Sequence, residues 1–136
     1  MITGKTHYCD FDVRDYEIDS EGIVNNAIYL HYMEHARHTF CREVGLSYEQ
    51  MRQQGITPVV AKLEIAYRTP LQSCDHVRCE LTVERRGPRF IFHQTIHNIS
   101  LGSIAAVATV TIACLVDGRL SRGDDLAQAF APFLIN

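Results

Sequence analysis

The sequence predicts an α+β domain in which an antiparallel sheet of about five strands wraps around one long central helix. Three observations support this prediction: one long run of helical periodicity, several alternating segments joined by short turns, and a mismatch in width between a helix and a sheet. The chain has 136 residues, of which 46% are hydrophobic. Residues 1–136 are therefore expected to form one domain with a hydrophobic core of its own.

The first third of the chain is expected to hold one strand and the long helix. Residues 6–14 alternate between apolar and polar side chains, as a half-buried strand does. After a polar turn over residues 15–22, a helical pattern runs to about Val44 and ends at Gly45. One face of this helix carries an apolar stripe formed by Tyr29, Met33, Ala36, Phe40 and Val44, with Leu30 at its margin. A short helical turn follows at residues 47–54.

The remaining residues predict four strands and a short terminal helix. The strands are expected at residues 59–68, 76–84, 90–96 and 103–116, and the helix at residues 124–131. In the first of these strands, one face is expected to carry Val59, Ala61, Leu63, Ile65 and Tyr67. Because the links between successive strands are short, antiparallel pairing is favoured.

The widths of the two layers predict how they pack. Five strands about 4.8 Å apart form a sheet about 24 Å wide, whereas a helix is about 10–12 Å across. Because a flat sheet would leave apolar side chains uncovered beside the helix, the sheet is expected to twist and curl around it. The open edge that remains would be covered by a second copy of the chain. A homodimer is therefore expected, with a dimer of dimers as the alternative.

Composition and charge exclude several classes of protein. Thirteen Lys and Arg against 16 Asp and Glu argue against nucleic acid as the main partner. The longest apolar stretch, residues 104–116, is interrupted by threonines and is too short to cross a membrane, and the N-terminus has no apolar run typical of a secretory signal. The five cysteines include no C-x-x-C pair, which favours free buried thiols in a reducing compartment. A cytoplasmic protein without a membrane partner is expected.

The turn before the long helix carries the residues best suited to chemistry. Asp19 lies just before a helix start, where unpaired backbone N–H groups carry a partial positive charge. Such donors stabilise an oxyanion, and Asp19 would activate a water or attack a carbonyl directly. The residues alone leave an alternative open, in which Asp19 or Ser20 only caps the helix and neighbouring acidic residues favour its dipole. Those neighbours are Asp15, Glu17 and Glu21.

A longer motif around this turn resembles a known family. Residues 13–30 read V-R-x-Y-x-x-D-x-x-G-x-V-N-N-A-x-Y-L and continue to Glu34-His35-Ala36-Arg37. This motif resembles the hotdog-fold thioesterases of the 4-hydroxybenzoyl-CoA thioesterase type, and its Asn-Asn form is similar to bacterial long-chain acyl-CoA and plant acyl-ACP thioesterases. Later features agree, among them a Y-x-x-P step within residues 65–70. The resemblance covers roughly residues 6–117 and implies a hotdog fold.

The resemblance also implies an activity and a set of residues. The activity is hydrolysis of an acyl thioester, acyl-CoA or acyl-ACP, to a free acid and a thiol, without a metal or other cofactor. The family's catalytic carboxylate falls on Asp19, and its helix-start backbone donor falls on Asn26. Arg37 is expected to pair with a buried group or to reach across a dimer interface. The residues expected to bind substrate, some of them on a second subunit, are Val24, Asn25, Tyr29, Arg37, Val59, Val60 and Ala61.

Four arginines are candidates for the phosphates of coenzyme A. Arg85, Arg86 and Arg89 flank a tight turn, and Arg68 ends a strand. The guanidinium group recognises phosphate well, so these residues are added to the expected binding set. The alternative for the first three is an ordinary solvated hairpin.

Three other functions compete with hydrolysis as interpretations of the sequence. His31-Tyr32-Met33-Glu34-His35 matches the H-x-x-E-H pattern of inverted zinc peptidases, but those enzymes are far larger and need a third distant ligand, so no metal site is expected. A hotdog hydratase or dehydratase of enoyl thioesters would pair the aspartate with a histidine before the helix, and no histidine lies between Asp15 and Tyr29. A non-catalytic acyl-thioester-binding protein would bind coenzyme A compounds without turnover.

Overall fold

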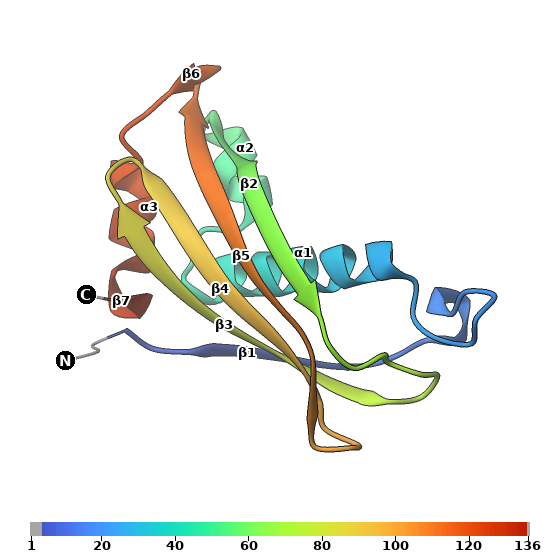
Figure 1. Cartoon of the computed structure of the whole chain (residues 1–136). Coiled ribbons are helices and arrows are strands. Elements are labelled where there is room, and N and C mark those ends of the chain that lie inside the picture. The colour runs from blue at the N-terminus through green and yellow to red at the C-terminus, as the bar shows by residue number, and fades with distance from the viewer. Residues whose placement is uncertain (1–3, 136) are drawn as a thin grey trace.

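Five long antiparallel strands form a curled sheet in the computed structural model, which describes residues 4–135 (Figure 1). In their order across the sheet they are β1 (His7–Asp12), β3 (His76–Arg86), β4 (Arg89–Asn98), β5 (Ser103–Val116) and β2 (Ile56–Tyr67). The expected five antiparallel strands are thus confirmed. Two short strands, β6 (Arg119–Leu120) and β7 (Leu134–Ile135), pair with β5 and β3, and β7 runs parallel to its neighbour. Both are too short for an alternating pattern to indicate them.

The helices lie close to where the sequence patterns place them. They are α1 (Asn26–Glu43), α2 (Tyr48–Gln53) and α3 (Asp124–Phe130), with 3-10 turns η1 (Asp15–Glu17) and η2 (Ala131–Phe133). Helix α1 has 18 residues and ends before Gly45, whose φ of +83° stops the helical conformation. Within residues 4–135, no helix is both long enough and apolar enough to cross a membrane.

Helix α1 crosses one face of the sheet (Figure 1) and buries one side against it. Its buried residues are Tyr29, Tyr32, Met33, Ala36, Arg37, Phe40 and Cys41. The predicted stripe is therefore confirmed for four of its members, while Val44 and Leu30 are only half-buried. The buried side is wider than the predicted stripe because Tyr32 and Cys41 also turn toward the core.

An aromatic cluster fills the core near the C-terminal end of α1. Phe40 is fully buried, and its ring centroid lies 5.7 Å from Phe92, 5.0 Å from Phe130 and 5.1 Å from Phe133. The rings meet edge-on or tilted, as aromatic pairs prefer. Because Phe130 and Phe133 belong to α3 and η2, the C-terminal segment closes this end of the core.

Strand β2 is an edge of the sheet, and its pairing with β5 is irregular. A bulge at Ala61 shifts the register, so that Val60 pairs with Ile112 and Leu63 pairs with Val110. The expected alternation is therefore wrong at the start of this strand: Val60 rather than Val59 shares a face with Leu63. A bulge adds one residue to one strand only, and apolar alternation does not reveal it.

The cysteines are free thiols, and they differ in exposure. Cys9, Cys41, Cys79 and Cys114 are buried, whereas Cys74 is exposed in the loop between β2 and β3. The expectation of buried thiols is thus wrong for Cys74, because its loop lies on the surface. Burial raises the pKa of Cys41 and of Cys79 to about 12, so neither thiol ionises near neutral pH.

We expect Ellman's reagent to modify one thiol per native chain rapidly, since only Cys74 of the five cysteines is exposed. All five thiols should react after unfolding in guanidinium chloride. The Cys74→Ser variant serves as the control and should lose the rapid phase. A rapid phase that counts two or more thiols, or that survives in Cys74→Ser, would contradict this assignment.

Candidate active site

A pocket of about 240 Å³ lies where the turn before α1, the first turn of α1 and the end of β2 meet. Its lining residues are Asp19, Ile23, Val24, Asn26, Tyr29, Tyr67, Arg68, Thr69, Pro70 and Ala105. The structure thus brings both predicted catalytic positions together, along with three of the predicted binding residues. Asn25, also predicted, lies next to the pocket as the N-cap residue of α1.

Asp19 lies in a tight turn that its own backbone and side chain help to close. Its amide donates to the carbonyl of Ile23 at 2.8 Å, and its carbonyl accepts from the amide of Gly22 at 3.1 Å. Gly22 has a φ of +79°, which a residue without a β-carbon adopts without strain. One carboxylate oxygen, Oδ1, accepts from the amide of Glu21 at 2.8 Å. Within residues 4–135 the other oxygen has no hydrogen-bond donor, so it is available to a ligand in the pocket.

The N-terminus of α1 leaves the backbone amide of Asn26 open. The side chain of Asn25 accepts from the amide of Ala27 at 2.9 Å, and its carbonyl accepts from the amide of Ile28. The alternative in which Asp19 or Ser20 caps α1 is therefore wrong, because Asn25 is the cap. Among the residues that the structure describes, none accepts a hydrogen bond from the Asn26 amide. This N–H lies at the positive end of the helix dipole, in a residue that lines the pocket.

Replacing Asn25 by alanine should lower the free energy of unfolding by about 1 kcal/mol, because the Ala27 amide loses its acceptor. Urea denaturation of the two proteins measures this difference. Asn25→Ser is the matched control, since a serine hydroxyl also caps helices and should restore most of the stability. Equal stability of the alanine variant and the wild type would show that this cap contributes nothing.

Two tyrosines form one wall of the pocket and connect β2 to α1. The Tyr67 hydroxyl donates to the Asn26 carbonyl at 2.9 Å, and its ring meets that of Tyr29 at 5.2 Å, nearly perpendicular. The amide of Leu71 donates to the Tyr29 hydroxyl at 3.2 Å. Burial raises the pKa of Tyr29, which keeps its phenol neutral. Sequence reasoning missed Tyr67, although the Y-x-x-P step begins with this residue.

Arg37 is buried in the chain and does not line the pocket. Its guanidinium donates from Nη1 to Oε1 of Gln94 at 3.0 Å, and Gln94 in turn donates to the Met33 carbonyl. The expectation that Arg37 pairs with a buried group is confirmed. Its partner is a neutral amide on β4, which no sequence pattern indicated.

The structure places Arg85, Arg86 and Arg89 at the other end of the sheet. Arg89 pairs with Ala113 of β5, and the pocket residue Ala105 lies about 26 Å away along that strand. Arg85 donates to two backbone carbonyls, those of Gly87 and Arg122. These arginines therefore do not meet Asp19 within one chain, and their role in binding remains a prediction.

Val59, Val60 and Ala61 also lie outside the pocket of their own chain. They occupy the first half of the edge strand β2, and Val60 is 51% exposed. Tyr67, at the far end of the same strand, is the β2 residue that lines the pocket. The three residues are thus open to a second chain, and their contribution to substrate binding remains a prediction.

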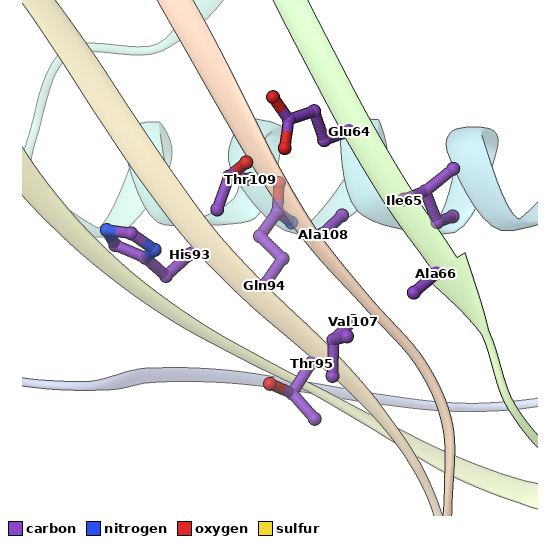
Figure 2. A pocket seen from close by; sticks show the side chains of 9 residues that line it. All are labelled: Glu64, Ile65, Ala66, His93, Gln94, Thr95, Val107, Ala108 and Thr109. Carbon is purple, nitrogen blue, oxygen red and sulfur yellow. The ribbon is translucent and has the colours of Figure 1, made fainter.

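A second hollow of about 420 Å³ lies on the sheet over β2, β4 and β5 (Figure 2). It is lined by Glu64, Ile65, Ala66, His93, Gln94, Thr95, Val107, Ala108 and Thr109. The side chain of Gln94 bonds to α1 on the other face, and His93 pairs with Glu84 at 2.9 Å. This hollow shares no lining residue with the smaller pocket and is not lined by Asn26, so it lacks the donor that the smaller pocket offers.

The histidines of the H-x-x-E-H segment lie on the exposed side of α1. His31, Glu34 and His35 are all exposed. Within residues 4–135, no group of three histidine, cysteine or acidic side chains is arranged to hold a metal ion.

Residues 13–132 match the family described as the thioesterase-like superfamily. The chain belongs to this family. The expected curled antiparallel sheet of a hotdog thioesterase is thereby confirmed. The acyl-CoA thioesterase YbgC of Haemophilus influenzae is 31% identical over 81% of this chain and 82% of its own length. The acyl-acyl carrier protein thioesterase ATL3 of Arabidopsis thaliana is 36% identical to this chain. The match covers 51% of this chain and 36% of the length of that relative.

The same fold is found in a solved structure of another protein. The crystal structure of a hypothetical protein, TT1821, from Thermus thermophilus superposes with a TM-score of 0.86 at 24% sequence identity. The match covers 93% of this chain and 98% of that one. The two chains therefore share a fold, while the family of this chain follows from the match over residues 13–132.

Proposed function

We propose that the protein hydrolyses an acyl thioester of coenzyme A or of an acyl carrier protein to a free acid and a thiol. One observation carries this proposal: Asp19, which has a carboxylate, and Asn26, which has an open backbone amide, line the same pocket. Membership of the thioesterase-like superfamily supports it, as do relatives named as acyl-CoA and acyl-ACP thioesterases.

The geometry supports different roles for the Asn26 backbone amide and the Asp19 side chain. The thioester carbonyl oxygen would accept from the Asn26 N–H, at a helix start whose dipole stabilises the negative charge of the tetrahedral intermediate. Asp19 would take a proton from an attacking water, and collapse of the intermediate would expel the thiolate, which is then protonated. In the second route Asp19 attacks directly, forming a mixed anhydride that water hydrolyses. Both routes give the same products.

The rest of the site is proposed to come from a second copy of the chain. Strand β2 ends the sheet and leaves Val59, Val60 and Ala61 open to a partner, which supports a homodimer in which these residues form the other wall. A dimer of dimers would extend the same arrangement. In this proposal α1 is the single central helix of each hotdog subunit, and Arg68 at the pocket binds phosphate or another anionic group of the carrier.

The experiment that tests the proposal is a panel of acyl-CoA and acyl-ACP substrates in which release of thiol is measured. Acyl chains of increasing length and aromatic acyl groups belong in the panel. A reaction without substrate is needed because the protein has five thiols of its own. We expect turnover of at least one class. Binding of acyl-CoA without release of acid would instead identify the non-catalytic binding protein.

The hydratase alternative has less support from the structure. No histidine lies among the residues that line the pocket, so the Asp–His pair of those enzymes has no counterpart there. Enoyl-CoA belongs in the same panel, and formation of a hydroxyacyl thioester would support that alternative.

A further inference from the structure

The carboxylate of Glu17 is buried in η1, two residues before Asp19. Glu17 is 6% exposed, yet its oxygens are well supplied with donors. Oε1 accepts from the Arg14 amide at 2.8 Å and from the Tyr32 hydroxyl at 2.7 Å, and Oε2 lies 3.4 Å from the Arg14 guanidinium. Glu17 lies outside the helix and its carboxylate is buried, which the sequence pattern did not indicate.

These bonds tie the Asp19 turn to α1 at two levels. The side chain of Glu17 reaches Tyr32, in the second turn of the helix, and its carbonyl accepts from the amide of the N-cap residue Asn25 at 3.1 Å. The other side of the turn is held by the Val24 amide, which donates to the Leu71 carbonyl at 2.9 Å. The segments that enter and leave the turn are thus anchored on either side of Asp19, at Glu17 and at Val24.

The turn itself does not determine where Asp19 lies relative to α1. Its hydrogen bonds join Asp19 to Glu21, Gly22 and Ile23, so they fix its internal shape only. Asp19 is half-buried and the two residues after it are exposed, so little packing holds the tip. Its position therefore depends on the residues that flank the turn, among them the anchors at residues 17 and 24.

We infer that Glu17 is a positioning residue, which acts with Tyr32 to hold the Asp19 carboxylate opposite the Asn26 amide. This inference rests on the proposed function. A buried carboxylate is stable only when donors surround it, and here two of those donors are fixed by the backbone of η1 and by α1. Burial and the Glu17 carboxylate both raise the pKa of Tyr32, which keeps its hydroxyl protonated as a donor. Displacement of a reacting group by about 1 Å is enough to cost about 100-fold in rate.

The test compares kcat and KM of Glu17→Ala, Glu17→Gln and Tyr32→Phe with those of the wild type. Glu17→Ala should lower kcat by about 100-fold and leave KM within about twofold, because the groups that line the pocket are unchanged. Glu17→Gln keeps one acceptor oxygen and should recover part of the loss, and Tyr32→Phe should lower kcat by about tenfold. Since the two groups act as a unit, the double variant Glu17→Ala/Tyr32→Phe should be no slower than Glu17→Ala.

Matched controls separate positioning from general destabilisation. Glu43→Gln removes a carboxylate that bonds to His7 at the other end of α1, and Tyr48→Phe removes the hydroxyl of a half-buried side chain in α2. Both should keep kcat within about twofold at temperatures where every variant is folded, as circular dichroism will show. A Glu17→Ala or Glu17→Gln protein that retains wild-type kcat, or that changes KM alone, overturns the inference. If Glu17→Ala does not fold, Glu17→Gln and Tyr32→Phe carry the test.

Amide hydrogen exchange tests the anchor without any substrate. The Asp19 amide donates to the Ile23 carbonyl within the turn, and the Asn25 amide donates to the Glu17 carbonyl. Both amides should exchange faster in Glu17→Gln than in the wild type. Unchanged exchange at both amides refutes the anchor, whatever the activity. An inactive wild type with faster exchange in the variant would refute the proposed function and leave the anchor standing.

Discussion

Replacing Asp19 by asparagine should lower kcat for thioester hydrolysis by about 10²–10⁴-fold and change KM by less than about threefold. The amide can neither accept a proton from water at neutral pH nor attack the carbonyl, so both proposed routes are lost. The Asn26 donor and the tyrosine wall remain, so binding of the substrate is preserved. Steady-state kinetics on the best substrate of the panel measures both constants.

The asparagine variant also separates catalysis from local structure. Oδ1 of Asp19 accepts from the Glu21 amide, and the side-chain carbonyl of asparagine supplies the same acceptor. Asp19→Ala loses both functions, so a larger loss in that variant would measure the contribution of the turn. Glu21→Gln is the neighbouring control and should retain the wild-type rate. Full activity in Asp19→Asn would show that the carboxylate only shapes the turn, and the proposed mechanism would fail.

Truncating Phe40 to alanine should have the largest effect on stability, about 3–5 kcal/mol in the free energy of unfolding. Phe40 is fully buried and contacts aromatic rings of β4, α3 and η2, so its removal opens a cavity that rigid neighbours cannot fill. Urea or guanidinium denaturation followed by circular dichroism measures the loss.

A smaller truncation and a kinetic measurement make this prediction specific. Phe40→Leu keeps most of the apolar volume and should cost distinctly less than Phe40→Ala. Because Phe40 does not line the pocket, kcat of the folded fraction should match that of the wild type for both variants. A loss below about 1 kcal/mol in Phe40→Ala would mean that the C-terminal segment does not pack on α1 as the structure shows.

Local features of the sequence predicted the elements well. The end of α1 follows from the glycine at position 45, and the long strands follow from alternation, because both depend on neighbouring residues only. The bulge at Ala61 escaped prediction because it depends on how β2 pairs with β5. The same limit applies to Glu17: an acid next to a helix start is typical of a dipole partner, and only the approach of Tyr32 makes it a buried acceptor.

The candidate site also combines residues that a local motif predicts with residues that only the folded structure brings together. Asp19 and Asn26 are seven residues apart and belong to one motif, and both line the pocket. Arg85, Arg86 and Arg89 are far from Asp19 in the sequence, and chain order does not say which end of a sheet a hairpin occupies. Arg68 and Tyr67 adjoin the pocket because β2 ends beside the start of α1, which becomes visible only after the strand is placed.

The contact between Tyr67 and the Asn26 carbonyl has a consequence for how the proposed activity would respond to dilution. Strand β2 has the unpaired edge at which a second chain is proposed to bind. Its last residue, Tyr67, bonds to the first residue of α1. Dissociation of two such chains would expose the edge of β2 and weaken the hydrogen bond from the Tyr67 hydroxyl to α1. Specific activity would then fall at protein concentrations where subunits part, even though each isolated chain retains its own aspartate and its own amide.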